Sequence, residues 1–356
     1  MRRNLVGLDI GHTGVRAVGI SGGSTPTISA VGAAPVAPGA VNEGEVLDSD
    51  GVAEAIKKAW SKTRLGKDVV LGVSGRHVIV RQVELPWMEE KAFRKALPYR
   101  ISGLLPVPVE DLILDSVVIG DTAKDGTGAR VLTVLLVAAM RQPVLRAVAA
   151  VEKAGLRPVR IDLAGLALLR GSGGRATAPG VAEARIDIGA EVTTVVVQVD
   201  GVPRFVRMLA GEGGLKVSRA LAERLNVSLP EAEDLKRRLG TSASNVLSDS
   251  PSAQEQAARI VVDRATDDML TAIRSSLDFF LRNAPEVQGL GGAVLSGGGA
   301  KLPGLAERFA DILDIAVTHP DPLAGFKASN KTHDAVAGLS SSSLAIAAGL
   351  GLAEVA

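Results

Sequence analysis

Two short glycine turns, one in each half of the chain, hold the residues with the clearest capacity for chemistry. The first spans Asp9–Thr13 and the second Asp187–Glu191. In both, an apolar strand leads into Asp-Ile-Gly, a short polar turn and β-branched residues. Glycine lacks Cβ and tolerates positive φ, so the backbone N–H groups of such a turn can converge on a phosphate.

The turn amides are the predicted phosphate ligands. Gly11 with the amides of His12 and Thr13 would form one cradle, and Gly189 with Ala190 the other. Either turn alone is typical of an ordinary hairpin, because short motifs recur by chance. The pair, at matching positions in two similar sets of strands, predicts a nucleotide held between two related lobes.

A carboxylate precedes each turn, Asp9 in the first and Asp187 in the second. Both would point at the same volume as the turn amides. Two carboxylates suit a Mg²⁺ ion that keeps most of its water ligands. We therefore expect Asp9 and Asp187 to hold a metal through water, and not as a closed cage.

Two further glycine-rich turns and one charged pair are candidates for the rest of the site. Gly211–Gly214 precedes a predicted helix, whose N-terminus would attract an anion, although a simple helix start is an equal alternative. Ser296–Ala300 follows a strand and would accommodate a base, a phosphate or merely a tight corner. Glu233 and Lys236 share a helix face and would contact ribose and adenine; the alternative is an exposed ion pair of little energy.

The elements that must position these turns form a weak internal repeat. Each half opens with three adjacent strand patterns, and helices follow. The stretch 171–180, rich in glycine, is the expected crossing between the halves. The strands are expected at 4–10, 15–21, 27–34, 185–188, 193–200 and 202–209, and the helices include 162–170, 214–225, 229–239, 253–283, 305–313 and 340–352.

The composition excludes several classes of protein. At 356 residues, of which 46% are hydrophobic, the chain should form two or more domains. The absence of cysteine excludes disulfides and thiolate metal sites and fits a cytosolic protein. A net charge of +1 gives no reason to expect nucleic acid as a ligand, and no segment reaches the ~20 apolar residues of a membrane span.

These motifs resemble the phosphate-1, phosphate-2 and adenosine motifs of the actin-like ATPase superfamily, which includes actin, sugar kinases and FtsA. The matching segments are Leu8–Val18, Arg185–Gln198 and Leu295–Phe309, and Ser343–Leu352 is similar to the second connecting helix. The resemblance implies an α/β, actin-like (ribonuclease H-like) two-lobed ATPase fold that binds ATP and Mg²⁺. The implied phosphate ligands are Gly11, His12, Thr13, Gly189, Ala190, Thr193, Gly213 and Gly214, and the implied adenosine ligands are Glu233, Lys236, Gly297, Gly298, Gly299 and Leu302.

The middle of the chain resembles the PilM family of type IV pilus assembly proteins. The similar segments, in matching order, are Val83–Pro86, Lys91–Leu97, Leu105–Leu112, Val134–Ala139, Ala154–Pro158 and Arg274–Phe280. The resemblance implies an FtsA-like arrangement with an inserted subdomain, 1C. The implied subdomains are 1A (1–79, 156–180 and 336–356), 1C (80–155), 2A (181–225 and 293–335) and 2B (226–292).

The resemblance implies that the protein is a scaffold and that the bound nucleotide acts as a conformational switch. Such a protein would sit in the cytoplasm beneath the inner membrane, which it would reach through its partners. A groove between the first lobe and 1C would hold the N-terminal tail of a PilN-like membrane protein, and the pilus motor ATPases are further candidate partners.

Some residues depart from the family pattern. His12 stands where a small hydroxyl residue is usual, and Arg100 stands where relatives commonly carry an acidic residue. Leu104 and Val107 occupy commonly aromatic positions. The counterpart of the first connecting helix offers Asp162 but no Gln or Glu placed to orient a water, so we expect slow or negligible ATP hydrolysis and assign no catalytic residue.

Two alternatives remain open from the sequence. An FtsA-like cell-division tether would need an amphipathic membrane helix, which the final residues 349–356 do not resemble. A small-molecule kinase would need a catalytic base at the lobe interface, and none is evident beyond Asp9 and Asp187.

Overall fold

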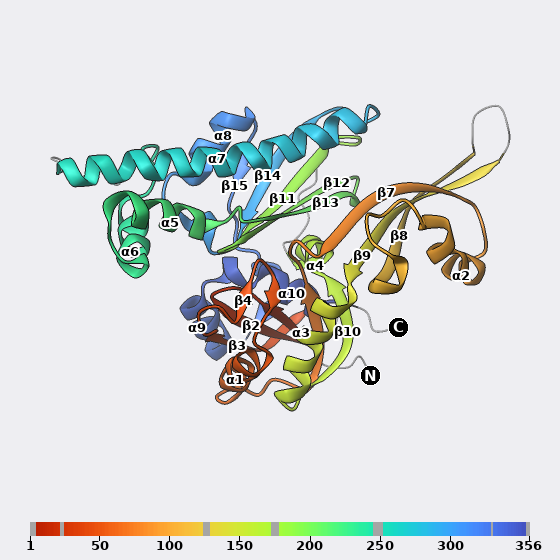
Figure 1. Ribbon diagram of the computed structural model, residues 1–356, viewed down its shortest axis with the longest axis horizontal. Coiled ribbons are helices and arrows are strands. Elements are labelled where there is room, and N and C mark those ends of the chain that lie inside the picture. The colour runs from red at the N-terminus through yellow and green to blue at the C-terminus, as the bar shows by residue number, and fades with distance from the viewer. Residues whose placement is uncertain are drawn as a thin grey trace.

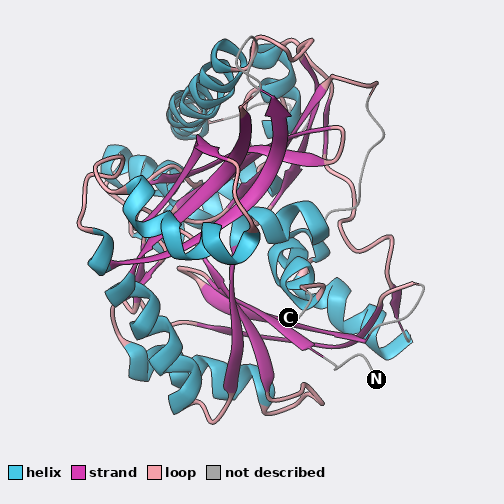
Figure 2. Cartoon of the chain, turned by 90° about the vertical axis from the view of Figure 1, so that its right-hand side faces the viewer, coloured by secondary structure: helices cyan, strands magenta, loops and turns pink. Residues whose placement is uncertain are grey.

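The computed structural model describes residues 5–21, 25–123, 129–171, 178–244, 252–328 and 330–353. Two lobes, each built on its own β-sheet, lie one above the other, and a third, smaller sheet projects from their side (Figure 1). Figure 2 shows the strands in an upper and a lower group, with helices above the upper group and below the lower one.

The first lobe is built on a six-stranded sheet whose central strand, β1 (Leu5–Ile10), ends at the first glycine turn. β1 is almost wholly buried, pairs antiparallel with β2 (Gly14–Ser21) and runs parallel to β6 (Asp68–Val73). The outer strands are β3 (Thr27–Pro35), β10 (Arg157–Leu163) and β16 (Lys327–Ala328), and a small hairpin joins β4 (Val41–Asn42) to β5 (Glu45–Val46).

Helices cover both faces of this sheet. α1 (Ser49–Trp60) begins where the Asp48 carboxylate accepts hydrogen bonds from two backbone amides, and it packs with α3 (Arg141–Lys153). The opposite face carries α4 (Ala164–Gly171) and α10 (Ala345–Gly351), with α9 (Asn330–Leu339) and η3 (Ser341–Leu344) nearby.

Small residues let α10 approach the sheet and α4 closely. A Cβ on Gly7 of β1 would lie 2.0 Å from the carbonyl oxygen of Ala347, and a Cβ on Gly349 would lie 1.8 Å from that of Ala167. This is the reason why the sequence of the final helix consists largely of Ala and Gly.

The inserted subdomain is a three-stranded antiparallel sheet in the order β7-β9-β8, covered by α2 (Glu90–Ile101). Its strands are β7 (Val78–Pro86), β8 (Leu112–Ala123), which follows η1 (Val109–Asp111), and β9 (Arg130–Met140). The expected range of 80–155 is too long at its C-terminal end, because α3 packs into the first-lobe core through Ala150 and Val151. α2 continues past Pro98 as far as Ile101.

The second lobe repeats the plan with a five-stranded sheet in the order β13-β12-β11-β14-β15. The strands are β11 (Ala182–Ile188), β12 (Val192–Val199), β13 (Val202–Ala210), β14 (Leu290–Ser296) and β15 (Val317–Thr318). The helices are α5 (Gly214–Leu225), α6 (Leu229–Leu239), α7 (Ala253–Asn283), η2 (Gly299–Lys301) and α8 (Leu305–Leu313).

The chain returns to the first lobe earlier than the expected boundary after residue 335. β16 pairs in parallel with β3, and Leu323 already packs against Val18 of the first sheet. The expected helix 162–170 also begins too early, because residues up to Leu163 belong to β10. Part of the expected linker, 172–177, lies outside the described residues.

Candidate functional site

The two glycine turns close matching hairpins. The Gly11 amide donates to the Gly14 carbonyl over 3.0 Å, and the Gly189 amide donates to the Val192 carbonyl over 3.0 Å. Each turn therefore has two residues at its tip, and the His12, Thr13 and Ala190 amides have no backbone acceptor among the described residues. Free N–H groups at two facing hairpin tips are suited to binding an anion.

Asp9 and Asp187 come together in the cleft between the lobes. Burial raises the pKa of Asp9, and it raises the pKa of Asp187 to about 6, with the negative charge of Asp9 adding to the effect. The side chains nevertheless keep a partial exposure to solvent, 17% for Asp9. Two poorly solvated carboxylates that share one cleft are suited to a shared cation.

Arg16 is a cleft residue that was not predicted from the sequence. Its guanidinium lies 3.7 Å from the Asp9 carboxylate and close to the Thr13 hydroxyl and the Gly14 carbonyl. The positive charge lowers the pKa of Asp9 and Asp187 against the effect of burial. Arg16 faces Asp9 across the β1–β2 pair, so strand register could have indicated it.

The third turn packs directly on the second. The amides of Gly214 and Leu215, at the start of α5, donate to the carbonyls of Gly189 and Ala190. The buried Thr193 hydroxyl donates to the Glu212 carbonyl over 2.5 Å, so it fixes this turn. Thr193, Gly213 and Gly214 thus adjoin the second turn, and their contact with phosphate stays a prediction.

Glu233 and Lys236 form a partly buried ion pair, so the alternative of an exposed pair is wrong. Their charged groups are 2.7 Å apart, and Lys236 is buried. The Lys236 ammonium also donates to the Gly214 carbonyl and the Ser218 hydroxyl, each over 2.9 Å. The pair therefore joins α6 to the start of α5, beside the glycine turns.

The triple-glycine turn after β14 packs on the second hairpin. A Cβ on Gly299 would lie 2.5 Å from the Ile188 side chain, and one on Gly297, where φ is +88°, would lie 2.4 Å from the Ile188 carbonyl oxygen. Gly298 has nothing within 4 Å of a Cβ, so it faces open space. Leu302 follows η2 and packs with both second-lobe cores.

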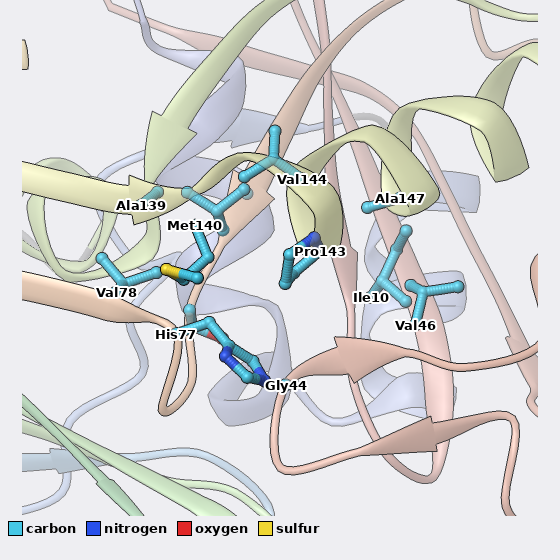
Figure 3. A pocket seen from close by; sticks show the side chains of 13 residues that line it. Ile10, Gly44, Val46, His77, Val78, Ala139, Met140, Pro143, Val144 and Ala147 are labelled. Carbon is cyan, nitrogen blue, oxygen red and sulfur yellow. The ribbon is translucent and has the colours of Figure 1, made fainter. Parts of the chain in front are cut away.

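A hollow, separate from the cleft between the lobes, lies between the first sheet and the inserted subdomain (Figure 3). Its lining is mainly apolar and includes Ile10, Val46, Val78, Met140 and Ala147. Ile10 immediately precedes the first glycine turn, so this hollow adjoins the wall of the cleft between the lobes. The resemblance implied a groove between the first lobe and 1C, but none of the residues that line this hollow was predicted to line it.

The structure also limits what the described residues can do. They contain no group of three or more His, Asp or Glu side chains placed to hold a metal ion. Among the same residues, no helix is long and apolar enough to cross a membrane.

The two lobes, each opening with a three-stranded meander and facing the other across a cleft with paired turns, define an actin-like ATPase fold. The chain matches the family model for the type IV pilus assembly protein PilM over residues 7–355. It therefore belongs to the PilM family of type IV pilus assembly proteins.

Solved structures agree with this assignment. The chain is similar to a PilM–PilN type IV pilus biogenesis complex, with a TM-score of 0.82, 26% identity and coverage of 99% of this chain and 98% of the other. The ethanolamine utilization protein EutJ from Carboxydothermus hydrogenoformans has a TM-score of 0.57, 16% identity and coverage of 99% and 90%. MreB5 of Spiroplasma citri bound to AMPPNP has a TM-score of 0.54, 13% identity and coverage of 99% and 96%, which supports the fold alone.

Proposed function

We propose that this chain is an ATP-binding scaffold of the inner-membrane platform that assembles a type IV pilus. In this proposal the hairpin tips at Gly11 and Gly189 bind the phosphates, and Asp9 and Asp187 hold Mg²⁺ through water. The glycines after Ser296, with Glu233 and Lys236, surround the adenosine.

The pairing of Asp9 with Asp187 carries the nucleotide proposal. Each carboxylate is placed by a separate sheet, and each is surrounded by protein yet open to the cleft. Ionising both costs free energy because they repel and are poorly solvated. A hydrated divalent cation would remove that cost, so the donor set fits the metal that accompanies ATP.

Hydrolysis is proposed to be slow. α4, the counterpart of the first connecting helix, begins after Asp162, and that carboxylate is bound by Arg170 and the Leu163 amide. It is therefore not free to orient an attacking water. The nucleotide would act mainly by favouring one arrangement of the lobes over another.

The apolar hollow beside β7 and α3 is the proposed site for the cytoplasmic tail of a PilN-like membrane protein. The similar solved complex contains PilN, and the hollow has the apolar walls that an extended tail with large aliphatic residues would fill. Through such a partner the scaffold would stay at the cytoplasmic face of the membrane, and motor ATPases are further proposed partners.

One hairpin links the two proposed sites. Gly44 and Val46 line the hollow, whereas the backbone amide of Glu43, in the same β4–β5 hairpin, contacts Glu191 of the second lobe. A movement of the second lobe would thus displace one wall of the hollow. This contact is the proposed route by which nucleotide biases partner binding.

Isothermal titration calorimetry tests the nucleotide proposal. Mg²⁺-ATP should bind the native protein at one site, and Asp187→Ala should remove most of that binding. A phosphate-release assay on the same samples should show negligible turnover. Unchanged affinity in Asp187→Ala would place the nucleotide elsewhere.

A further inference from the structure

The carboxylate of Glu191, at the tip of the second glycine turn, joins the two lobes. Its side chain is 2% exposed. Oε2 accepts a hydrogen bond from the Glu43 amide over 2.8 Å and lies 2.8 Å from Nδ1 of His12. Oε1 accepts from the guanidinium of Arg219, on α5 of its own lobe, over 2.8 Å.

The imidazole of His12 is held as a donor. Nδ1 lies 2.9 Å from the Val41 carbonyl oxygen as well as 2.8 Å from the Glu191 carboxylate. Both neighbours are acceptors, so Nδ1 must carry a hydrogen. A long side chain at this position therefore reaches the other lobe, which a small hydroxyl residue would not.

The Glu43 amide is held in place for the same contact. Glu43 and Gly44 have φ of +47° and +84°, as in a type I′ hairpin turn. Positive φ is unfavourable for a glutamate, so packing must maintain it. A Cβ on Gly75 would lie 2.2 Å from the Glu43 carbonyl oxygen, which shows how closely this turn is packed.

Burial makes these contacts decisive for the relative position of the lobes. A carboxylate removed from water is stable only while donors replace its hydration. Among the described residues, three groups donate to Glu191: those of His12 and Glu43 belong to the first lobe, whereas Arg219 stays with Glu191 when the lobes separate. The charge of Glu191 therefore favours the closed cleft over a partly opened one.

We propose that Glu191 is an interlobe latch, which holds the cleft closed without nucleotide and must release before nucleotide enters. Glu191 directly follows Ala190, so the latch contacts adjoin the predicted phosphate cradle. The effect on nucleotide entry rests on the proposed function, whereas the effect on lobe closure does not.

Distance measurements between the lobes test the latch directly. The chain has no cysteine, so spin labels on Lys58→Cys and Glu223→Cys report only on those sites. Both are exposed, on α1 of the first lobe and α5 of the second (Figure 1). Pulsed electron–electron double resonance without nucleotide should give one narrow distance distribution in the otherwise native protein.

Four variants should separate the latch from general structural effects. Glu191→Ala and His12→Ala should each lengthen and broaden the distribution, whereas His12→Asn, which keeps a donor near Nδ1, should restore most of the native distance. Asp68→Asn removes a carboxylate–arginine pair confined to the first lobe and should change nothing. Circular dichroism melts confirm that each variant is folded.

Stopped-flow binding of a fluorescent ATP analogue with Mg²⁺ tests the effect on entry. Glu191→Ala should raise the association rate constant roughly three- to tenfold, because more molecules are open beforehand. Unchanged distances in folded Glu191→Ala and His12→Ala would overturn the latch. A weaker affinity with unchanged distances would instead make Glu191 a nucleotide ligand. If no nucleotide binds at all, the proposed function fails and the distances still decide the latch.

Discussion

The hydroxyl of Ser296 donates to Oδ1 of Asp187 over 2.8 Å, and the two residues are register partners on the adjacent parallel strands β14 and β11. The bond fixes the position of the Asp187 carboxylate, whose pKa the nearby charge of Asp9 raises. It also lowers the pKa of Asp187, but burial has the larger effect and the result is about 6. Asp187 is therefore ionised at neutral pH at a cost in free energy, which a bound cation would reduce.

Asp187→Asn should make the protein more stable but less responsive to nucleotide. The amide keeps an oxygen for Ser296 and removes the buried charge, so the free energy of unfolding at pH 7.5 should rise by about 2 kcal/mol. In the native protein, Mg²⁺-ATP at ~100 times its Kd should add about 2.7 kcal/mol, and the variant should lose most of this gain. Thermal melts with and without ligand measure both effects.

The higher stability of Asp187→Asn and its weaker stabilisation by Mg²⁺-ATP should occur together. Asp68→Asn, far from the cleft at the start of β6, is the control and should keep the full ligand-induced shift. An Asp187→Asn protein that is stabilised by Mg²⁺-ATP as much as the native protein would contradict the metal site.

The raised pKa of Asp187 should also make the stability of the protein depend on pH. The pKa of Asp187 rises from 3.8 to about 6 on folding, so between these values the folded state binds more protons than the unfolded chain. The contribution of Asp187 to the free energy of unfolding should therefore fall by about 2 to 3 kcal/mol as pH rises from about 4 to about 6. Above about pH 6 it should level off. Urea unfolding at several pH values, compared with Asp187→Asn, isolates this contribution.

Metal-dependent binding should change in the opposite direction. A protonated carboxyl group does not hold Mg²⁺, so the stabilisation by Mg²⁺-ATP should increase as pH rises through about 6. A ligand-induced shift that is the same at pH 5.5 and pH 8 would show that Asp187 takes no part.

Gly298 and Gly299, neighbours in the triple-glycine turn after β14, provide a matched pair of substitutions. Gly299→Ala would bring a Cβ to 2.5 Å from the Ile188 side chain, so we expect a loss of about 1 to 3 kcal/mol in stability. Gly298 has φ of −66° and nothing within 4 Å of a Cβ, so alanine should be tolerated there. If adenosine lies over this turn, Gly298→Ala should nevertheless weaken nucleotide binding.

Calorimetry and thermal melts on the two variants separate packing from binding. The expected pattern is a stable Gly298→Ala with roughly tenfold weaker binding, about 1.4 kcal/mol, and a destabilised Gly299→Ala. Native affinity in Gly298→Ala would move the base away from the triple-glycine turn.

The sequence predicted those elements whose signals are local. α7 was expected over 253–283, as observed; its start is marked locally, because Ser252 and Glu255 form a capping box. β10 was not expected, because Pro158 and the mixed charge of this edge strand hide any alternation. β16 has two residues and exists only through its pairing with β3, which no local pattern reveals.

In the site, too, features with local sequence signals were predicted and those that depend on distant contacts were not. The glycine turns and their carboxylates were visible as repeated spacing in the sequence. The role of Glu191 was not, because its partners His12 and Glu43 are far away along the chain and belong to the other lobe. Contacts between lobes depend on their relative position, and spacing within one segment carries no information about it.

The ion pair between Glu233 and Lys236 should matter for stability as well as binding. Lys236→Met removes a buried cation and leaves the partly buried Glu233 carboxylate without its ion-pair partner, so a loss of about 3 kcal/mol is expected. Glu233→Gln with Lys236→Met should lose less than the sum of the single variants. Chemical denaturation of the native protein, the two single variants and the double variant gives the coupling energy. Strictly additive losses would show that the two side chains do not stabilise each other.

The hollow beside the inserted subdomain should respond to a change of volume. Ala147 of α3 lines it, and Leu145 of the same helix is 47% exposed. Ala147→Leu should fill part of the hollow and weaken binding of a PilN-type tail peptide at least tenfold, about 1.4 kcal/mol. Leu145→Ala is the matched control and should leave the affinity unchanged. Fluorescence anisotropy with a labelled peptide measures both, and equal affinities for the two variants would place the tail at another surface.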